Sequence, residues 1–215
     1  MEDNELKVLW ASYNEKVDKS LQISQKLLDN SSDLRVKTLL NSMKPTKIAL
    51  VIVGLVWVFF IDSLVIDTFG EASLFFTISA GLQSVISKIA IGVYIYQLVL
   101  INQIDLTQPL VSTQEKLSTL KATSLGIARV LFLQLPLWST FYLHDALFVR
   151  ENLLWLGFQL TITADLTWLA VWLFFNIKYE NRHKKWFKWL FDGKDWTPVI
   201  QSMEVLAELK EFKKN

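Results

Sequence analysis

The chain has 215 residues, of which 52% are hydrophobic, and its formal net charge is +1. So small a charge argues against a nucleic-acid partner, and the lack of cysteine excludes disulfides and thiolate metal sites. The first residues, Met-Glu-Asp-Asn-Glu, are acidic and polar, unlike a cleaved signal peptide, so we expect the first membrane segment to act as its own insertion signal.

Residues 1–46 predict an amphipathic helical region with a break near Asn30. Its apolar residues recur at steps of three and four, which is typical of one stripe on a helix. Such a stripe either packs on another part of the same protein or binds a partner protein, and both interpretations stay open. The candidate partner-binding face consists of Leu6, Trp10, Tyr13 and Val17.

Residues 47–177 predict a domain of four transmembrane helices. The first helix, 48–66, follows the boundary Lys44-Pro45-Thr46-Lys47 and carries only Asp62 as a charged residue. Lysines at this edge predict that it faces the cytoplasm, and the acidic loop that follows predicts the outer side. About 20 residues suffice to cross the hydrocarbon.

The second and fourth spans, 75–103 and 152–177, are apolar except for one central charge each, Lys88 and Asp165. Both lie near mid-depth, where an unpaired charge costs about 2.5–3.5 kcal/mol. The sequence therefore predicts an intramembrane ion pair of Lys88 with Asp165. In the alternative, Lys88 reaches outward and Asp165 is protonated or bonds a neighbouring threonine hydroxyl.

Between these spans we expect a polar cytoplasmic loop over 104–125, with one short helix, and a third span over 126–147. Pro136 lies inside that span and should kink it, because proline removes a backbone hydrogen bond. Glutamines 97, 134 and 159 predict hydrogen bonds between helices.

Residues 178–215 predict a basic and aromatic membrane interface, followed by a cytoplasmic amphipathic helix that can pack against the N-terminal helix. Aromatic rings favour the headgroup layer, and lysine and arginine favour the cytoplasmic side. The predicted interface residues are Lys178, Arg182, Lys184, Lys185, Trp186, Lys188 and Trp189.

The sequence contains no recognisable catalytic, cofactor-binding or metal-binding motif. Its two histidines cannot form a multi-histidine metal site, and its seven glycines are isolated from one another. We therefore expect neither a cofactor nor an enzymatic activity.

Three segments carry a resemblance to a known family: Glu5 to Tyr13, Ser42 to Pro45, and Phe132 to Trp138. Together they resemble a family of uncharacterised four-helix membrane proteins of Bacteroidota-type bacteria. Some members are encoded beside sigma factors of the extracytoplasmic-function type, and the resemblance implies an anti-sigma or signalling role. It carries over no functional residue.

These observations predict an all-α, multi-pass protein of a bacterial inner membrane with both termini in the cytoplasm. The predicted function is that of a non-enzymatic scaffold or regulator in the lipid bilayer. Its cytoplasmic helices would bind a protein partner, such as a sigma factor, or a second copy of the chain. The alternative is a small transporter or channel component that works through Lys88 and Asp165.

Overall fold

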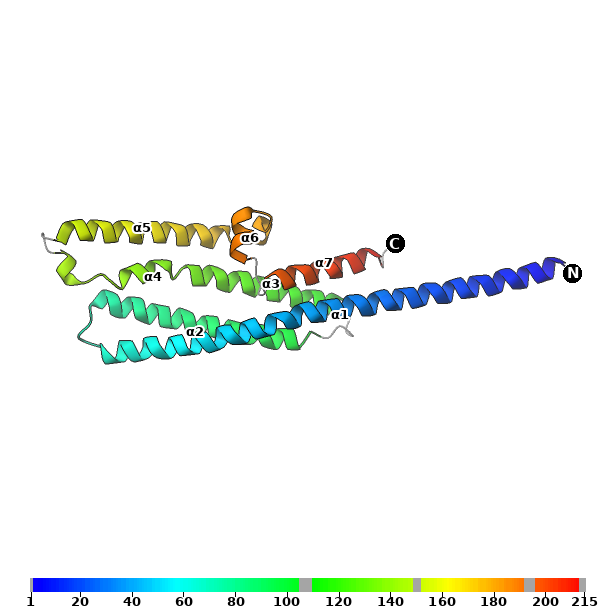
Figure 1. The fold of residues 1–215 in the computed structure, drawn as a ribbon, viewed down its shortest axis with the longest axis horizontal. Helices are drawn as coiled ribbons and strands as arrows, with labels where there is room; N and C mark the ends of the chain where they lie inside the picture. The colour runs from blue at the N-terminus through cyan, green and yellow to red at the C-terminus, as the bar shows by residue number, and fades with distance from the viewer. Residues whose placement is uncertain (1, 105–109, 149–151, 192–195, 213–215) are drawn as a thin grey trace.

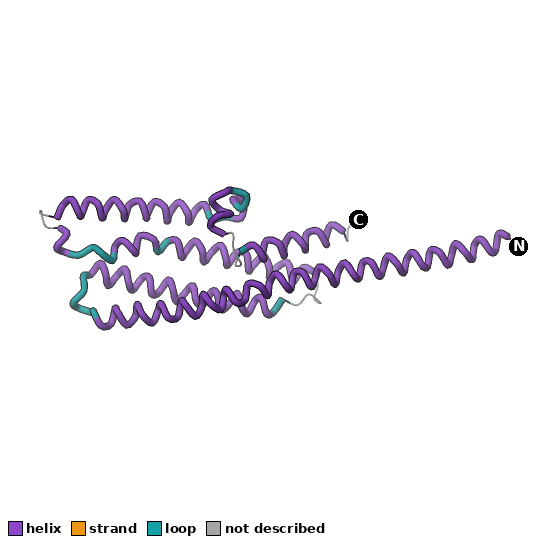
Figure 2. Tube along the Cα trace, viewed as in Figure 1, coloured by secondary structure: helices purple, strands orange, loops and turns teal. Residues whose placement is uncertain are grey.

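The computed structural model describes residues 2–104, 110–148, 152–191 and 196–212, and these are helical apart from short loops (Figures 1 and 2). The expected all-α bundle is confirmed, with no strand in those ranges. The α-helices are α1 (Glu2–Asp67), α2 (Leu74–Asn102), α3 (Leu110–Phe132), α4 (Leu135–Thr140), α5 (Leu153–Asn176), α6 (Lys185–Phe191) and α7 (Thr197–Phe212). Two 3-10 turns are η1 (Asp145–Phe148) and η3 (Tyr179–Asn181).

The helices form an elongated bundle in which α3 and α4 lie between two outer layers (Figure 1). One outer layer is the antiparallel pair of α1 and α2, and α2 also packs on α3 and α4. The other is α5, which packs on α3, α4 and η1. Helix α7 packs on α1 and α3 at the end from which the N-terminal part of α1 projects.

Four helical stretches are long and apolar enough to cross a membrane: 30–67, 74–102, 112–140 and 153–176. Large apolar side chains point outward from them, and Phe59, Ile66 and Leu154 are 76%, 74% and 91% exposed. Polar side chains such as Ser79 and Gln83 on α2 are instead buried. This arrangement is the reverse of a water-soluble bundle and suits a lipid surrounding.

A tightly packed apolar core lies toward one end of these stretches, where α1, α2, α3 and α7 meet. It includes Val36 and Met43 of α1, Leu117 of α3 and Val199 of α7, all with no exposed area. The expected packing of the C-terminal helix against the N-terminal helix is thus confirmed. Here the helices are amphipathic and bury their apolar faces, as helices in water do.

The expected helix break near Asn30 and the expected start of a new helix at Pro45 are both wrong, because α1 runs continuously from Glu2 to Asp67 with Pro45 inside. Proline removes one hydrogen bond within a helix, here to the carbonyl of Asn41. Asn41 and Pro45 are both exposed, so water can satisfy that carbonyl. Buried residues on either side of the proline hold both halves of the helix against the same neighbours.

The polar stretch at 104–125, expected as a loop with one short helix, is helical over 110–125, and this helix continues into the third span as α3. Residues 105–109 of the expected loop lie outside the described residues. The break that Pro136 predicts is present, at Leu133 and Gln134. Helix α3 ends at Phe132, four residues before the proline, where the missing N–H would have bonded. Helix α4 ends at Thr140, short of the expected 147.

Gly54 lies at a close approach of α1 and α2. A Cβ atom there would lie 3.0 Å from Cγ1 of Ile91. We expect Gly54→Val to force the two helices apart and lower the unfolding free energy by about 1–3 kcal/mol. Denaturant titration followed by tryptophan fluorescence in detergent would measure it. Gly157→Val on α5 is the control, because no atom lies within 4 Å of a Cβ there.

Candidate functional site

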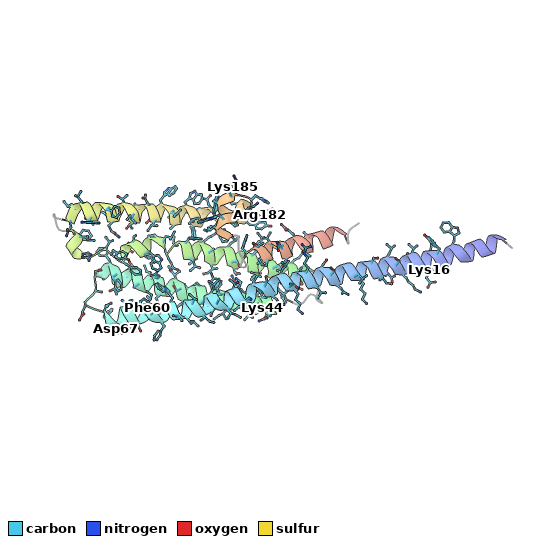
Figure 3. The ribbon with its side chains drawn as sticks, in the orientation of Figure 1. Lys16, Lys44, Phe60, Asp67, Arg182 and Lys185 are labelled. Atoms are coloured by element: carbon cyan, nitrogen blue, oxygen red, sulfur yellow. The ribbon has the colours of Figure 1, made fainter. Side chains whose placement is uncertain are left out.

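The N-terminal part of α1 extends far beyond the rest of the bundle, and Lys16 marks this projecting part in Figure 3. Of the predicted partner-binding face, Trp10 is 61% exposed, Tyr13 62% and Val17 39%. The fourth member, Leu6, lies outside the residues whose side chains the structure describes. Leu21 continues the stripe one turn further and is 56% exposed. The opposite face carries the ion pair of Lys19 with Glu15 at 2.7 Å.

Lys88 forms an ion pair with Asp62 and not with Asp165. Its Nζ atom lies 2.9 Å from Oδ2 of Asp62, and the hydroxyl of Ser84 donates a hydrogen bond to the other carboxylate oxygen. Side chains on a helix lean toward its N-terminus. Because α1 and α2 are antiparallel, this directs the Lys88 side chain toward the Asp67 end of α1 and the Asp62 side chain in the opposite direction, toward Lys88. The sequence predicts Asp62 as the one charged residue of the first span but gives it no partner, so this pairing was missed.

The layer order explains why the expected pair of Lys88 with Asp165 does not form. Lys88 belongs to α2 and Asp165 to α5, and α3 and α4 lie between those helices (Figure 1). The sequence supports a similar depth for the two charges but does not say which helices are neighbours. Depth alone was therefore insufficient to predict the partner.

Asp165 lies on the exposed side of α5. The structure gives its carboxyl group no hydrogen bond or ion pair with any residue that it describes. The expected alternative, a bond from a neighbouring threonine, is also not met. Thr161, Thr163 and Thr167 instead bond the backbone carbonyls of Gly157, Gln159 and Thr163.

A buried lysine lies just before the apolar part of the first span, where the sequence predicts only a residue at the membrane edge. Lys47 is 1% exposed, and its Nζ donates to Oε1 of Gln97 over 2.6 Å. The Gln97 amide donates to the hydroxyl of Thr123 over 3.2 Å. The Lys47 ammonium also lies 5.3 Å from the ring centre of Tyr94. This network ties α1, α2 and α3 together.

A second polar chain connects α2, α4 and α5. The hydroxyls of Ser79 and Thr140 lie 2.7 Å apart, and Ser139 donates to the hydroxyl of Thr163 over 3.0 Å. The amide of Gln159 donates to the carbonyl of Ser139. The expectation that Gln97 and Gln159 bond across helices is confirmed, and these bonds fix the relative heights of α2, α4 and α5.

The basic and aromatic segment lies where α5 ends, and Arg182 and Lys185 mark it in Figure 3. Trp189 is 84% exposed, and Lys178, Lys184, Lys185 and Lys188 are also exposed, as an interface with lipid headgroups requires. Trp186 instead packs on Trp172 of α5, with ring centres 5.0 Å apart.

Arg182 is half-buried against the ring of Tyr179. Its guanidinium carbon lies 4.3 Å from that ring centre, and the ammonium of Lys121 lies 4.2 Å from the same centre. Two cations on one ring indicate a strongly positive region. A pocket of about 350 Å³ beside it is lined by Arg182, His183 and Lys188, but also by Glu204 and several aromatic rings.

None of these groups forms a metal centre: the described residues contain no cluster of three or more histidines and acids that could hold a metal ion. No family model, curated protein or solved structure matches the chain. What the arrangement can do therefore has to be argued from its own surfaces and charges.

Proposed function

We propose that the protein spans a bacterial inner membrane four times, with both termini in the cytoplasm. The outward-facing apolar side chains of the four candidate spans support the membrane placement. Lysines at positions 44, 178, 184 and 185 lie at one end of the spans, and Asp67 and Glu71 lie at the other. The excess of lysine marks the cytoplasmic side. The projecting part of α1 and the end of α7 lie beyond that same end (Figure 1).

In this orientation the protein is a non-enzymatic scaffold that presents α1 to a protein partner in the cytoplasm. The observation that carries this proposal is the exposed stripe of Trp10, Tyr13, Val17 and Leu21 on a helix held away from the bundle. Aromatic residues dominate the binding energy of many protein interfaces, and a helix that shows them at steps of three and four suits docking into an apolar groove.

The partner is a protein with an apolar groove that accepts one helix. The resemblance to proteins encoded beside sigma factors makes an extracytoplasmic-function sigma factor the first partner to look for. The transporter alternative relied on a pair of Lys88 with Asp165 that does not form within the chain. No other observation favours it.

We expect the Trp10→Ala variant to lose most of its affinity for the partner protein. The loss of a central aromatic side chain costs about 2 kcal/mol or more at a binding hot spot, which is a roughly thirtyfold loss of affinity. The measurement is quantitative co-purification of tagged protein from native membranes, with the bound proteins identified by mass spectrometry. The fraction of the protein that stays in the membrane pellet after alkaline carbonate extraction measures membrane insertion in the same preparation.

Lys19→Ala is the matched control, because Lys19 lies on the opposite face of α1 and makes only an exposed ion pair. That pair contributes about 0.3–0.5 kcal/mol, so the partner should be retained. Equal recovery of the partner with Trp10→Ala and with Lys19→Ala would show that the stripe does not bind it. Release of the chain by carbonate would instead contradict the membrane placement.

A further inference from the structure

Two faces of the bundle carry polar groups that remain exposed among apolar side chains. On the α1–α2 face, the side chains of Lys88 and Asp62 are 54% and 38% exposed, next to Phe59 and Val85. On the α5 face, Asp165 is exposed beside Trp168, which is itself 68% exposed. If the spans lie in the membrane as proposed above, lipid tails would surround all three charged groups. Such groups normally face protein or water.

The three groups lie at one depth in the bundle. Helices α2 and α5 run in the same direction (Figure 1), and the bonds through α4 place Ser79 of α2 level with the stretch from Gln159 to Thr163 of α5. Ser84, which bonds Asp62, lies five residues further along α2, and Asp165 lies two residues beyond Thr163. At about 1.5 Å per residue, Asp165 is level with Asp62 to within about one helical turn.

The two faces point away from each other, because α3 and α4 separate α2 from α5. Within one copy, Asp165 cannot reach Lys88. Two copies side by side in the same membrane can bring these residues together, because Asp165 and the Lys88–Asp62 pair lie at the same depth in every copy. The lysine ammonium has three N–H donors, and Asp62 accepts from one of them over 2.9 Å. The carboxylate of a neighbouring copy can therefore accept from another.

We propose that the face of α5 centred on Asp165 docks onto the α1–α2 face centred on Lys88 and Asp62 of a second copy of this chain. The proposal rests on the membrane placement argued above. The occupant is a second copy because this chain itself supplies an exposed acid at the matching depth. The contact joins two different faces, so it builds a ring or a row of copies and not a closed symmetric dimer.

The absence of cysteine allows a direct test with single cysteines in the full-length protein. One tagged copy carries Val85→Cys on α2, and a differently tagged copy carries Leu169→Cys on α5, one turn from Asp165. The two are co-expressed, and isolated membranes are oxidised or treated with a short bifunctional maleimide. We expect a crosslinked species that carries both tags, and neither variant expressed alone should crosslink.

Leu160→Cys is the matched control on α5. It is 50% exposed but lies about 140° around the helix from Asp165, so it should not crosslink to Val85→Cys. Adding Asp165→Leu to the copy with Leu169→Cys should lower the doubly tagged product by about tenfold. This change removes a polar group from the exposed face, so poor insertion would not explain the loss.

Carbonate extraction of the same membranes separates the two proposals. A chain that stays in the membrane yet gives no doubly tagged product overturns the docking of copies and leaves the membrane placement standing. Crosslinking of Val85→Cys to itself would also overturn it, since that product requires a symmetric contact. A crosslink from Val85→Cys to a different protein overturns it as well, because another occupant then covers the face.

Discussion

Replacing Gln97 by leucine is expected to destabilise the folded protein more than any other substitution on the half of α2 that ends at Asn102. The side chain of Gln97 has no exposed area, and its Oε1 accepts from the ammonium of Lys47 over 2.6 Å. Leucine would remove a hydrogen bond to a charged group and leave that buried ammonium with one acceptor fewer. We expect a loss of about 1.5–3 kcal/mol in the free energy of unfolding.

Two variants make the Gln97 prediction specific. Gln103→Leu makes the same replacement at an exposed position just after α2 and should change the unfolding free energy by less than about 0.5 kcal/mol. Gln97→Glu keeps an acceptor for Lys47 and should recover most of the loss. Unfolding in detergent, followed through the nine tryptophans, is the measurement. If Gln97→Leu were as stable as Gln103→Leu, the Lys47 network would contribute nothing to folding.

The four long apolar stretches were predictable because hydropathy is a local property of the sequence. The second and fourth spans were placed within one residue of α2 and α5 at each end. The errors arose where a local signal was given too much weight. Pro45 was interpreted as a boundary, yet packing on both sides keeps α1 continuous. The polar residues before the third span predict a loop with one short helix, yet from Leu110 onward they belong to the same helix as the span, α3.

The candidate site was less predictable, because partners depend on which helices are neighbours. The sequence predicts that the two central charges are costly, but the partner of Lys88 follows from the antiparallel packing of α1 on α2. The sequence did contain one signal for the pairing of Lys88 with Asp62, because a lysine side chain leans toward the N-terminus of its helix. Lys47 gave no such signal, since a lysine at a span end is as compatible with headgroup contact as with burial.

A double-mutant cycle on Asp62 and Lys88 should give the largest coupling between any two charged residues of the proposed membrane region. Asp62→Leu leaves the Lys88 ammonium without its carboxylate in an apolar surrounding, at a cost of up to about 2.5–3.5 kcal/mol. Lys88→Leu should cost less, because Ser84 still donates to the Asp62 carboxylate. The double replacement by leucine removes both charges together and should be close to the wild type.

The coupling energy is therefore expected to have a magnitude of about 2 kcal/mol or more, well above the scatter of independent sites. The measurement is reversible unfolding in dilute detergent micelles, where each chain is isolated and contacts between copies do not contribute. Asp67→Leu, an exposed acid at the end of α1, is the control and should change stability by less than about 0.5 kcal/mol.

Additive costs of the two single replacements would contradict the ion pair in the folded chain. A cost for Asp62→Leu no larger than that for Asp67→Leu would show that the Lys88 ammonium reaches water or headgroups without help from Asp62. A double variant that is almost as stable as the wild type would be the more decisive result, because apolar residues of similar volume can replace a pair of charges but not one charge alone. It would show that the pair acts as one unit within the α1–α2 face.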